Sequence, residues 1–202
     1  MKVQIVLFPG YDELDAIAPY EVLQNAAREG ADVQTELVTL DGAEETTAGH
    51  DLRVRTTGRL DLNARPDLLL VPGGSYITRA PQGAWAEAQR GELPAAIAAL
   101  HQAGTIIAAV CTGTMLLAAA GLTRGRPATT HRAALDDLRA SGAEVVDARV
   151  VDDGDILTSG GVTSGLDLTL WLVERFFGPQ TAWAVEQGLE YERRGVVWRR
   201  PA

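Results

Sequence analysis

Short apolar, β-branched runs alternate along the chain with longer stretches rich in Ala and Leu. The short runs are apolar almost throughout, which indicates strands buried on both faces, and the longer stretches have helical length and spacing. The pattern predicts strands at residues 3–7, 33–39, 67–71, 105–110 and 156–158. It predicts helices at residues 14–28, 93–103, 112–120, 133–141 and 164–177. Alternation of this kind is typical of an α/β fold with a mostly parallel sheet.

Two further short apolar runs, at residues 52–56 and 145–151, are interpreted as additional strands. With 202 residues, 46% of them hydrophobic, the chain has enough apolar material for one compact domain. We therefore expect residues 1–202 to form a single-domain, flavodoxin-like sandwich with helices on both faces of the sheet. In such open sheets, ligands bind beyond the carboxyl ends of the strands.

Cys111 lies at the junction of a predicted strand and a predicted helix. A nucleophile elbow has this strand-turn-helix form, and it lifts the side chain above the sheet. The free N–H groups of the following helix favour a thiolate, so the sequence predicts a thiol with a lowered pKa. A lone cysteine is also commonly a small buried apolar residue. The elbow and its small neighbours favour the nucleophile.

Gly73 and Gly74 follow another predicted buried strand. Backbone without side chains at a strand end can point N–H groups at developing negative charge. Together with the N–H of Thr112, these glycines are predicted to line a substrate pocket that resembles an oxyanion hole. A tight turn that needs positive φ explains the glycine pair about equally well.

Two further titratable residues are candidates for this site. Asp15 lies early in the first predicted helix, where an acid is ordinarily a favourable charge in the first turn. Its apolar neighbours indicate the alternative, a buried carboxyl with a raised pKa that can donate a proton. Asp12 and Glu13 have the pattern of solvated acids. His131 follows a short apolar stretch and is expected to lie near Cys111, either as part of the pocket wall or as a base.

The composition of the chain limits the kinds of molecule that it is expected to bind. The net charge of -9 and the pI of about 4.8 disfavour binding to nucleic acid or to an anionic membrane. One cysteine excludes an internal disulfide, and three histidines without ligand spacing leave no predicted metal site and no cofactor. The short apolar N-terminal run is interrupted by Pro9-Gly10, which is not the pattern of a signal peptide, so we expect a cytoplasmic protein. We expect its partner to be a small-molecule substrate.

Five segments occur in the order typical of one family. They are Leu7-Phe8-Pro9-Gly10 with Leu14-Asp15, Val71-Pro72-Gly73-Gly74, Ala109-Val110-Cys111-Thr112-Gly113, Ala128-Thr129-Thr130-His131, and Thr158-Ser159-Gly160-Gly161. In this series the chain resembles the PfpI superfamily, a branch of the class I glutamine-amidotransferase-like fold, over nearly its full length. The resemblance implies a homodimer.

Within that superfamily, Asp15 paired with Cys111-Thr112 resembles the isonitrile hydratase branch. The resemblance implies that Cys111 attacks the terminal carbon of an isocyanide, that Asp15 handles protons, and that a thioimidate is hydrolysed to an N-substituted formamide. Thr112 stands where protease-like members carry histidine, so a peptidase dyad is absent there. Arg132 stands where hydratase-like relatives often carry tryptophan.

Two other functions remain open at this point. Similar domains form the ligand-sensing part of AraC-type regulators, but the chain ends soon after its last predicted helix, so we expect no helix-turn-helix module. The same cysteine also suits a glyoxalase-like or thiol-based stress enzyme.

Overall fold

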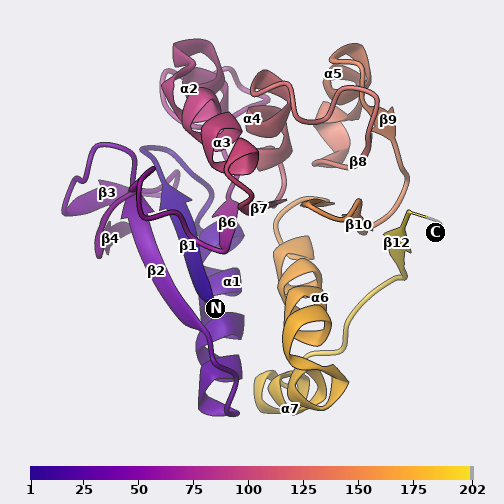
Figure 1. Cartoon of the computed structure of the whole chain (residues 1–202). Helices are drawn as coiled ribbons and strands as arrows, with labels where there is room; N and C mark the ends of the chain where they lie inside the picture. The colour runs from indigo at the N-terminus through magenta and orange to yellow at the C-terminus, as the bar shows by residue number, and fades with distance from the viewer. Residues whose placement is uncertain (201–202) are drawn as a thin grey trace.

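The computed structural model describes residues 1–200, in which an eight-stranded sheet lies between two layers of helices (Figure 1). Across the sheet the strands are β12 (Val197–Arg199), β10 (Val150–Asp152), β11 (Ile156–Ser159), β7 (Ile106–Ala109), β6 (Leu68–Val71), β1 (Lys2–Leu7), β2 (Gln34–Thr39) and β5 (Gly58–Arg59). Every neighbouring pair is parallel except β10 and β11. The predicted fold class, an α/β sandwich with a mostly parallel sheet, is confirmed.

The helices form two groups on opposite faces of this sheet (Figure 1). One group contains α1 (Glu13–Arg28), α6 (Ser164–Phe177) and α7 (Pro179–Leu189). The other group contains α2 (Ala84–Arg90), α3 (Glu92–Gln102), α4 (Gly113–Ala119) and α5 (Leu135–Ala140). Helix α5 directly follows a 3-10 turn, η1 (Arg132–Ala134). Two small sheets pair β3 (Glu45–Thr47) with β4 (Arg53–Arg55) and β8 (Pro127–Ala128) with β9 (Glu144–Val145). Within the described residues, no helix has the length and apolar character needed to cross a membrane.

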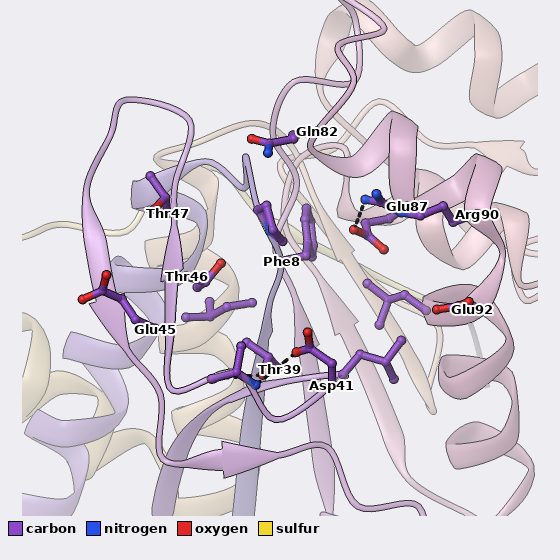
Figure 2. A pocket seen from close by; sticks show the side chains of 15 residues that line it. Phe8, Thr39, Asp41, Glu45, Thr46, Thr47, Gln82, Glu87, Arg90 and Glu92 are labelled. Carbon is purple, nitrogen blue, oxygen red and sulfur yellow. Dashed lines mark hydrogen bonds and ion pairs between the residues drawn. The ribbon is translucent and has the colours of Figure 1, made fainter.

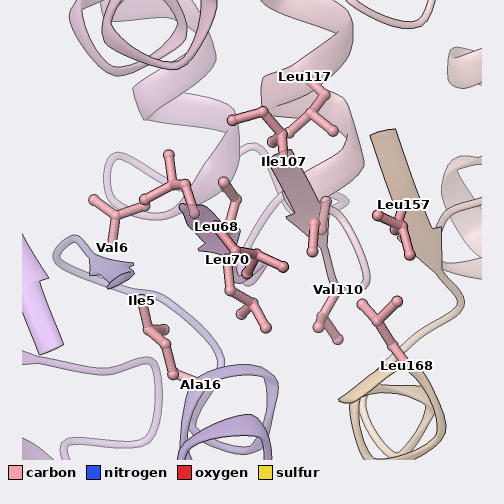
Figure 3. Packing of buried hydrophobic residues seen from close by; sticks show 14 of the residues in the cluster. Ile5, Val6, Ala16, Leu68, Leu70, Ile107, Val110, Leu117, Leu157 and Leu168 are labelled. Carbon is pink, nitrogen blue, oxygen red and sulfur yellow. The ribbon is translucent and has the colours of Figure 1, made fainter. Parts of the chain in front are cut away.

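The hydrophobic core fills both faces of the sheet. Figure 3 shows Ile5 directed toward Ala16 of α1, and Ile107 directed toward Leu117 of α4 on the opposite face. All four residues of β6 are buried, as the uninterrupted apolar run predicts. Each fully buried side chain of this kind stabilises the fold by about 1.5–3 kcal/mol before conformational entropy is counted. This packing gives the loops beyond the strands a rigid base.

The five strands and five helices that the alternating pattern predicts are all present, with small shifts at their ends. The two additional strands are placed differently. Residues 52–56 contribute β4 to a separate hairpin, and residues 145–151 divide between β9 and β10, because Asp147-Ala148-Arg149 form a loop that turns the chain from one sheet to another. The sequence did not predict α2, α7 or β12.

Candidate active site

Cys111 occupies a sharp turn between β7 and α4. Its φ is 57°, in the left-handed region that residues other than glycine rarely adopt. Two hydrogen bonds hold the turn: the Cys111 N–H donates to the Gly160 carbonyl at 3.0 Å, and Thr130 Oγ1 donates to the Cys111 carbonyl at 2.8 Å. A strained backbone that is fixed in this way is typical of a functional residue. The elbow predicted from the sequence is therefore present.

Two glycines permit close backbone contact between the loop after β6 and the turn that carries Cys111. A Cβ on Gly73 would lie 2.5 Å from the Thr112 nitrogen, and one on Gly113 would lie 2.2 Å from the Val71 carbonyl oxygen. No side chain fits at either position without moving the backbone. Gly73 and Gly113 thus permit backbone contact between the two loops that flank Cys111.

Asp15 lies in the first turn of α1 and has no exposed surface. Its Oδ2 accepts a hydrogen bond from the Gly73 N–H at 2.9 Å. Its Oδ1 is buried without a hydrogen-bond partner among residues 1–200, and the Cys111 side chain is close enough to influence this carboxyl. A buried carboxylate without full compensation is costly, so this environment favours the neutral acid.

Burial, together with the nearby charge of Asp12, raises the pKa of Asp15 to about 8. The Gly73 N–H, the Cys111 side chain and the Val162 N–H act on this pKa in the opposite direction but do not cancel the effect. Asp15 therefore retains a proton at neutral pH. The sequence predicted such a carboxyl from its apolar neighbours.

This raised pKa predicts a specific dependence of stability on pH. Between pH 3.8, the ordinary pKa, and about pH 8, the folded protein holds a proton that the unfolded chain releases. The contribution of Asp15 to the free energy of unfolding is fully present below this window and falls as pH rises through it, by at most about 1.4 kcal/mol per pH unit. Asp15→Asn cannot ionise, so its free energy of unfolding should lack this fall.

Urea unfolding of the wild type and Asp15→Asn at about pH 5 and about pH 8 measures the effect. We expect the variant to gain stability relative to the wild type at the higher pH. A difference between the two proteins that is independent of pH would contradict the raised pKa.

Burial raises the pKa of the Cys111 thiol, and the carboxylate form of Asp15 raises it further. The N–H groups of Thr112 and Val162 act in the opposite direction. The lowered pKa predicted from the elbow is therefore wrong: only 6% of Cys111 is exposed, and desolvation outweighs the effect of the N–H groups. Since each group disfavours ionisation of the other, the pair titrates as a unit that holds at most one negative charge at neutral pH.

The oxyanion role predicted for the loop glycines is also corrected. The Gly73 N–H donates to Asp15, and the Gly74 N–H donates to Thr112 Oγ1 at 3.0 Å. Both donors are engaged within the protein and hold the loop, the carboxyl and the elbow together. The N–H groups that act on the sulfur are those of Thr112 and Val162.

A pocket of about 180 Å³ opens at Cys111. Its walls are Asp12, Gly74, Ser75, Tyr76, Ile77, Thr78, Cys111, Thr112, His131 and Val162. This pocket brings together four of the predicted residues, Gly74, Cys111, Thr112 and His131, while Asp15 and Gly73 are not among its lining residues. Tyr76 and Ile77, which the sequence analysis did not select, form its apolar side. Asp12, predicted to be solvated, is part of the wall and affects the pKa of Asp15.

His131 lies across this pocket from the loop after β6. Its Nδ1 accepts a hydrogen bond from the Ala133 N–H at 3.2 Å, which leaves the proton of the neutral ring on Nε2. A Cβ on Gly161 would lie 2.3 Å from the His131 ring, so the glycine permits this placement. The ring is arranged to line the pocket and donate a hydrogen bond. Arg132 belongs to a neighbouring pocket instead.

A larger pocket, of about 490 Å³, lies beyond the ends of β1 and β2 and contains neither Cys111 nor Asp15 (Figure 2). Figure 2 shows the Glu87 and Arg90 ion pair at this pocket, whose wall contains no nucleophilic sulfur. Among residues 1–200, no three His, Cys, Asp or Glu side chains are grouped to hold a metal ion. The chemistry of Cys111 and Asp15, rather than pocket size, identifies the candidate site.

The fold and site define an α/β protein with a cysteine on a nucleophile elbow and a buried acid beside it. The sequence model of the DJ-1/PfpI family matches residues 1–175, and the chain belongs to this family. The resemblance inferred from the ordered motifs is confirmed.

Relatives in this family carry different activities. The chain is 35% identical to an isonitrile hydratase from Pseudomonas putida, over 95% of this chain and 78% of that protein. It is 31% identical to the HTH-type transcriptional regulator CdhR from Pseudomonas aeruginosa, over 90% of this chain but about half (52%) of the regulator. The crystal structure of Drosophila melanogaster DJ-1beta has the same fold, with a TM-score of 0.82 and 23% identity, over 95% of this chain and 98% of that chain.

Proposed function

We propose that this protein is an isonitrile hydratase, which adds water to an isocyanide to give an N-substituted formamide. The observation that carries the proposal is the buried Asp15 carboxyl beside Cys111 on the elbow, where burial raises its pKa to about 8. An isocyanide has no leaving group, so its hydration needs a nucleophile and a placed proton donor more than a proteolytic triad. The similarity to the Pseudomonas putida enzyme supports the same reading.

In the first step, Cys111 Sγ forms a bond to the terminal carbon of the isocyanide. Asp15 gives its proton to that carbon and takes up the thiol proton. The product is a thioimidate, S–CH=N–R, and Asp15 is again neutral at the end of the step. This relay uses the neutral form of Asp15, which its pKa of about 8 supplies at neutral pH.

In the second step, water adds to the carbon of the thioimidate. Asp15 assists proton transfer from water to nitrogen, the C–S bond breaks, and the sulfur recovers a proton. The products are the formamide, R–NH–CHO, and free Cys111. Thr112 and the Nε2–H of His131 line the pocket and orient the intermediate, while Tyr76 and Ile77 contact the apolar substituent R.

A sensing function is the second candidate, because the chain is similar over most of its length to about half of a transcriptional regulator. A glyoxalase-like reaction is the third, because a carbonyl also accepts a thiol nucleophile. The assay that separates these candidates incubates the pure protein with a simple alkyl isocyanide or, in parallel, with methylglyoxal. We expect formamide from the isocyanide and no catalysed loss of methylglyoxal. Turnover of methylglyoxal alone would contradict the hydratase, and no turnover of either would favour the sensor.

We further propose that residues 1–202 act as one domain, as a cytoplasmic homodimer without nucleic-acid partners. The acidic charge supports the last point, as does the pairing of the C-terminal arginines. Arg193 forms ion pairs with Glu174 and Glu186, and Arg200 with Asp153, so these cations are already engaged. Sedimentation at the mass of a single chain would contradict the dimer.

A further inference from the structure

The loop of residues 160–163, which follows β11, forms one side of the Cys111 environment. The Gly160 carbonyl accepts the Cys111 N–H, and Gly161 lies against the His131 ring. Val162 has a φ of 49°, an unusual conformation for a β-branched residue. In this conformation its N–H acts on both the Cys111 sulfur and the Asp15 carboxyl. Such a backbone persists only where its surroundings hold it.

Arg149 is the residue that ties this loop at both of its ends. Its carbonyl accepts a hydrogen bond from the Gly160 N–H at 3.0 Å. Its guanidinium Nη2 donates to Thr163 Oγ1 at 2.9 Å, and its Nε pairs with Asp167 at 2.5 Å. One side chain therefore joins the end of the loop to helix α6 by two separate nitrogens.

Asp167 anchors this arginine to the body of the protein. It is only 2% exposed, and besides Arg149 it accepts hydrogen bonds from the Tyr191 hydroxyl at 3.1 Å and the Arg194 N–H at 2.7 Å. Asp167 lies in the first turn of α6, which packs against α1, the helix that carries Asp15. Asp167 therefore lies in the same helical layer as Asp15.

We propose that Arg149 is a positioning residue, whose guanidinium, fixed by Asp167 and bonded to Thr163, holds Val162 in the conformation that directs its N–H to Cys111 and Asp15. The proposal rests on the reactive role proposed above for Cys111. Arg149 does not line the Cys111 pocket, so it acts through the loop and not by contact with substrate. Loss of the tie lets the loop relax, and the Val162 N–H then no longer favours the thiolate of Cys111.

The test measures how fast iodoacetamide alkylates Cys111 as a function of pH, because only the thiolate reacts and the chain has no other cysteine. This readout does not require isocyanide turnover, so it remains informative if the hydratase proposal fails. In Arg149→Met we expect the pH profile to move upward by about one unit, the size expected for one hydrogen bond to a charged group. Thr163→Val, which keeps every charge, should move it in the same direction by less.

Arg175→Met is the matched control. Arg175 also pairs with a buried acid, Asp152, and its side chain is 28% exposed against 26% for Arg149, but it has no hydrogen bond to the loop of residues 160–163. We expect Arg175→Met to keep the wild-type profile at a comparable loss of stability. A shift of equal size in Arg175→Met would show that general loosening is the cause, and would overturn the proposal.

Arg149→Lys separates positioning from charge. Lysine keeps the positive charge but cannot bond Thr163 and Asp167 with the geometry of a planar fork. Other charged or titratable groups facing Cys111 are Asp15 and Asp12 on the α1 side and His131 across the pocket, and all are unchanged in this variant. We expect Arg149→Lys to shift the profile as Arg149→Met does. A wild-type profile in Arg149→Lys, or no shift in Arg149→Met, would overturn the role of the tie.

Discussion

Replacement of Cys111 by alanine is expected to leave the protein folded and to reduce formamide production to below about one thousandth of the wild-type rate. The reason is that Cys111 is the only thiol in the pocket wall, and the hydroxyl groups beside it are poorer nucleophiles at neutral pH. The change removes one small buried atom from the elbow, so its cost in stability should be modest. Circular dichroism checks the fold, and steady-state kinetics with an alkyl isocyanide measures the rate.

Cys111→Ser sharpens this prediction. A serine hydroxyl has similar size but is a poorer nucleophile at neutral pH, and the site offers no adjacent histidine base at position 112 to activate it. We expect Cys111→Ser to be as inactive as Cys111→Ala. Wild-type turnover by either variant would exclude covalent catalysis at this residue.

Asp15→Asn should lower kcat by about 10²- to 10⁴-fold, the usual contribution of a placed proton donor. Asparagine keeps an oxygen for the Gly73 N–H but cannot relay a proton from sulfur to carbon. Stopped-flow or steady-state measurement of formamide release gives the value.

The neighbouring Asp12→Asn provides the control for this change. Asp12 accepts the Leu14 N–H at the start of α1, and asparagine is an equally good residue there, so the helix is retained. Loss of the Asp12 charge removes one cause of the raised pKa of Asp15, so we expect an acid shift in the pH profile and only a few-fold change in rate. Equal losses in the two variants would contradict a specific role for Asp15.

Much of the fold could be predicted because its central strands are buried on both faces. The run of β6 is apolar at every position, and a short run of this kind in an alternating β/α pattern indicates a strand in the interior of a parallel sheet. The sequence pattern did not predict the elements that form only through tertiary contacts, such as β12 and α2. The three residues of β12 carry no periodic pattern and form a strand only because β10 presents a free edge to them. Helix α2, seven residues between two glycines, is too short to show a helical repeat.

The site was predictable in part for the same reason. Cys111 and Asp15 stand out by residue type and by their apolar neighbours. The pKa of Cys111 was not predictable, since it depends on how far the folded chain buries the sulfur and how near it brings Asp15. Val162 and Arg149 were missed because an apolar residue and a loop arginine acquire their roles only through the backbone geometry of residues 160–163.

The most direct test of the central claim is to detect the bond between Cys111 and the substrate. Wild type and Asp15→Asn are mixed with an alkyl isocyanide, quenched in acid at short times, and analysed by intact-mass and peptide-mass spectrometry. We expect a mass gain of one isocyanide on the peptide that contains Cys111 in the wild type, a slower appearance of this adduct in Asp15→Asn, and no adduct in Cys111→Ala. An adduct on any other residue, or formamide formed by both proteins with unmodified Cys111 at every time point, would contradict the account.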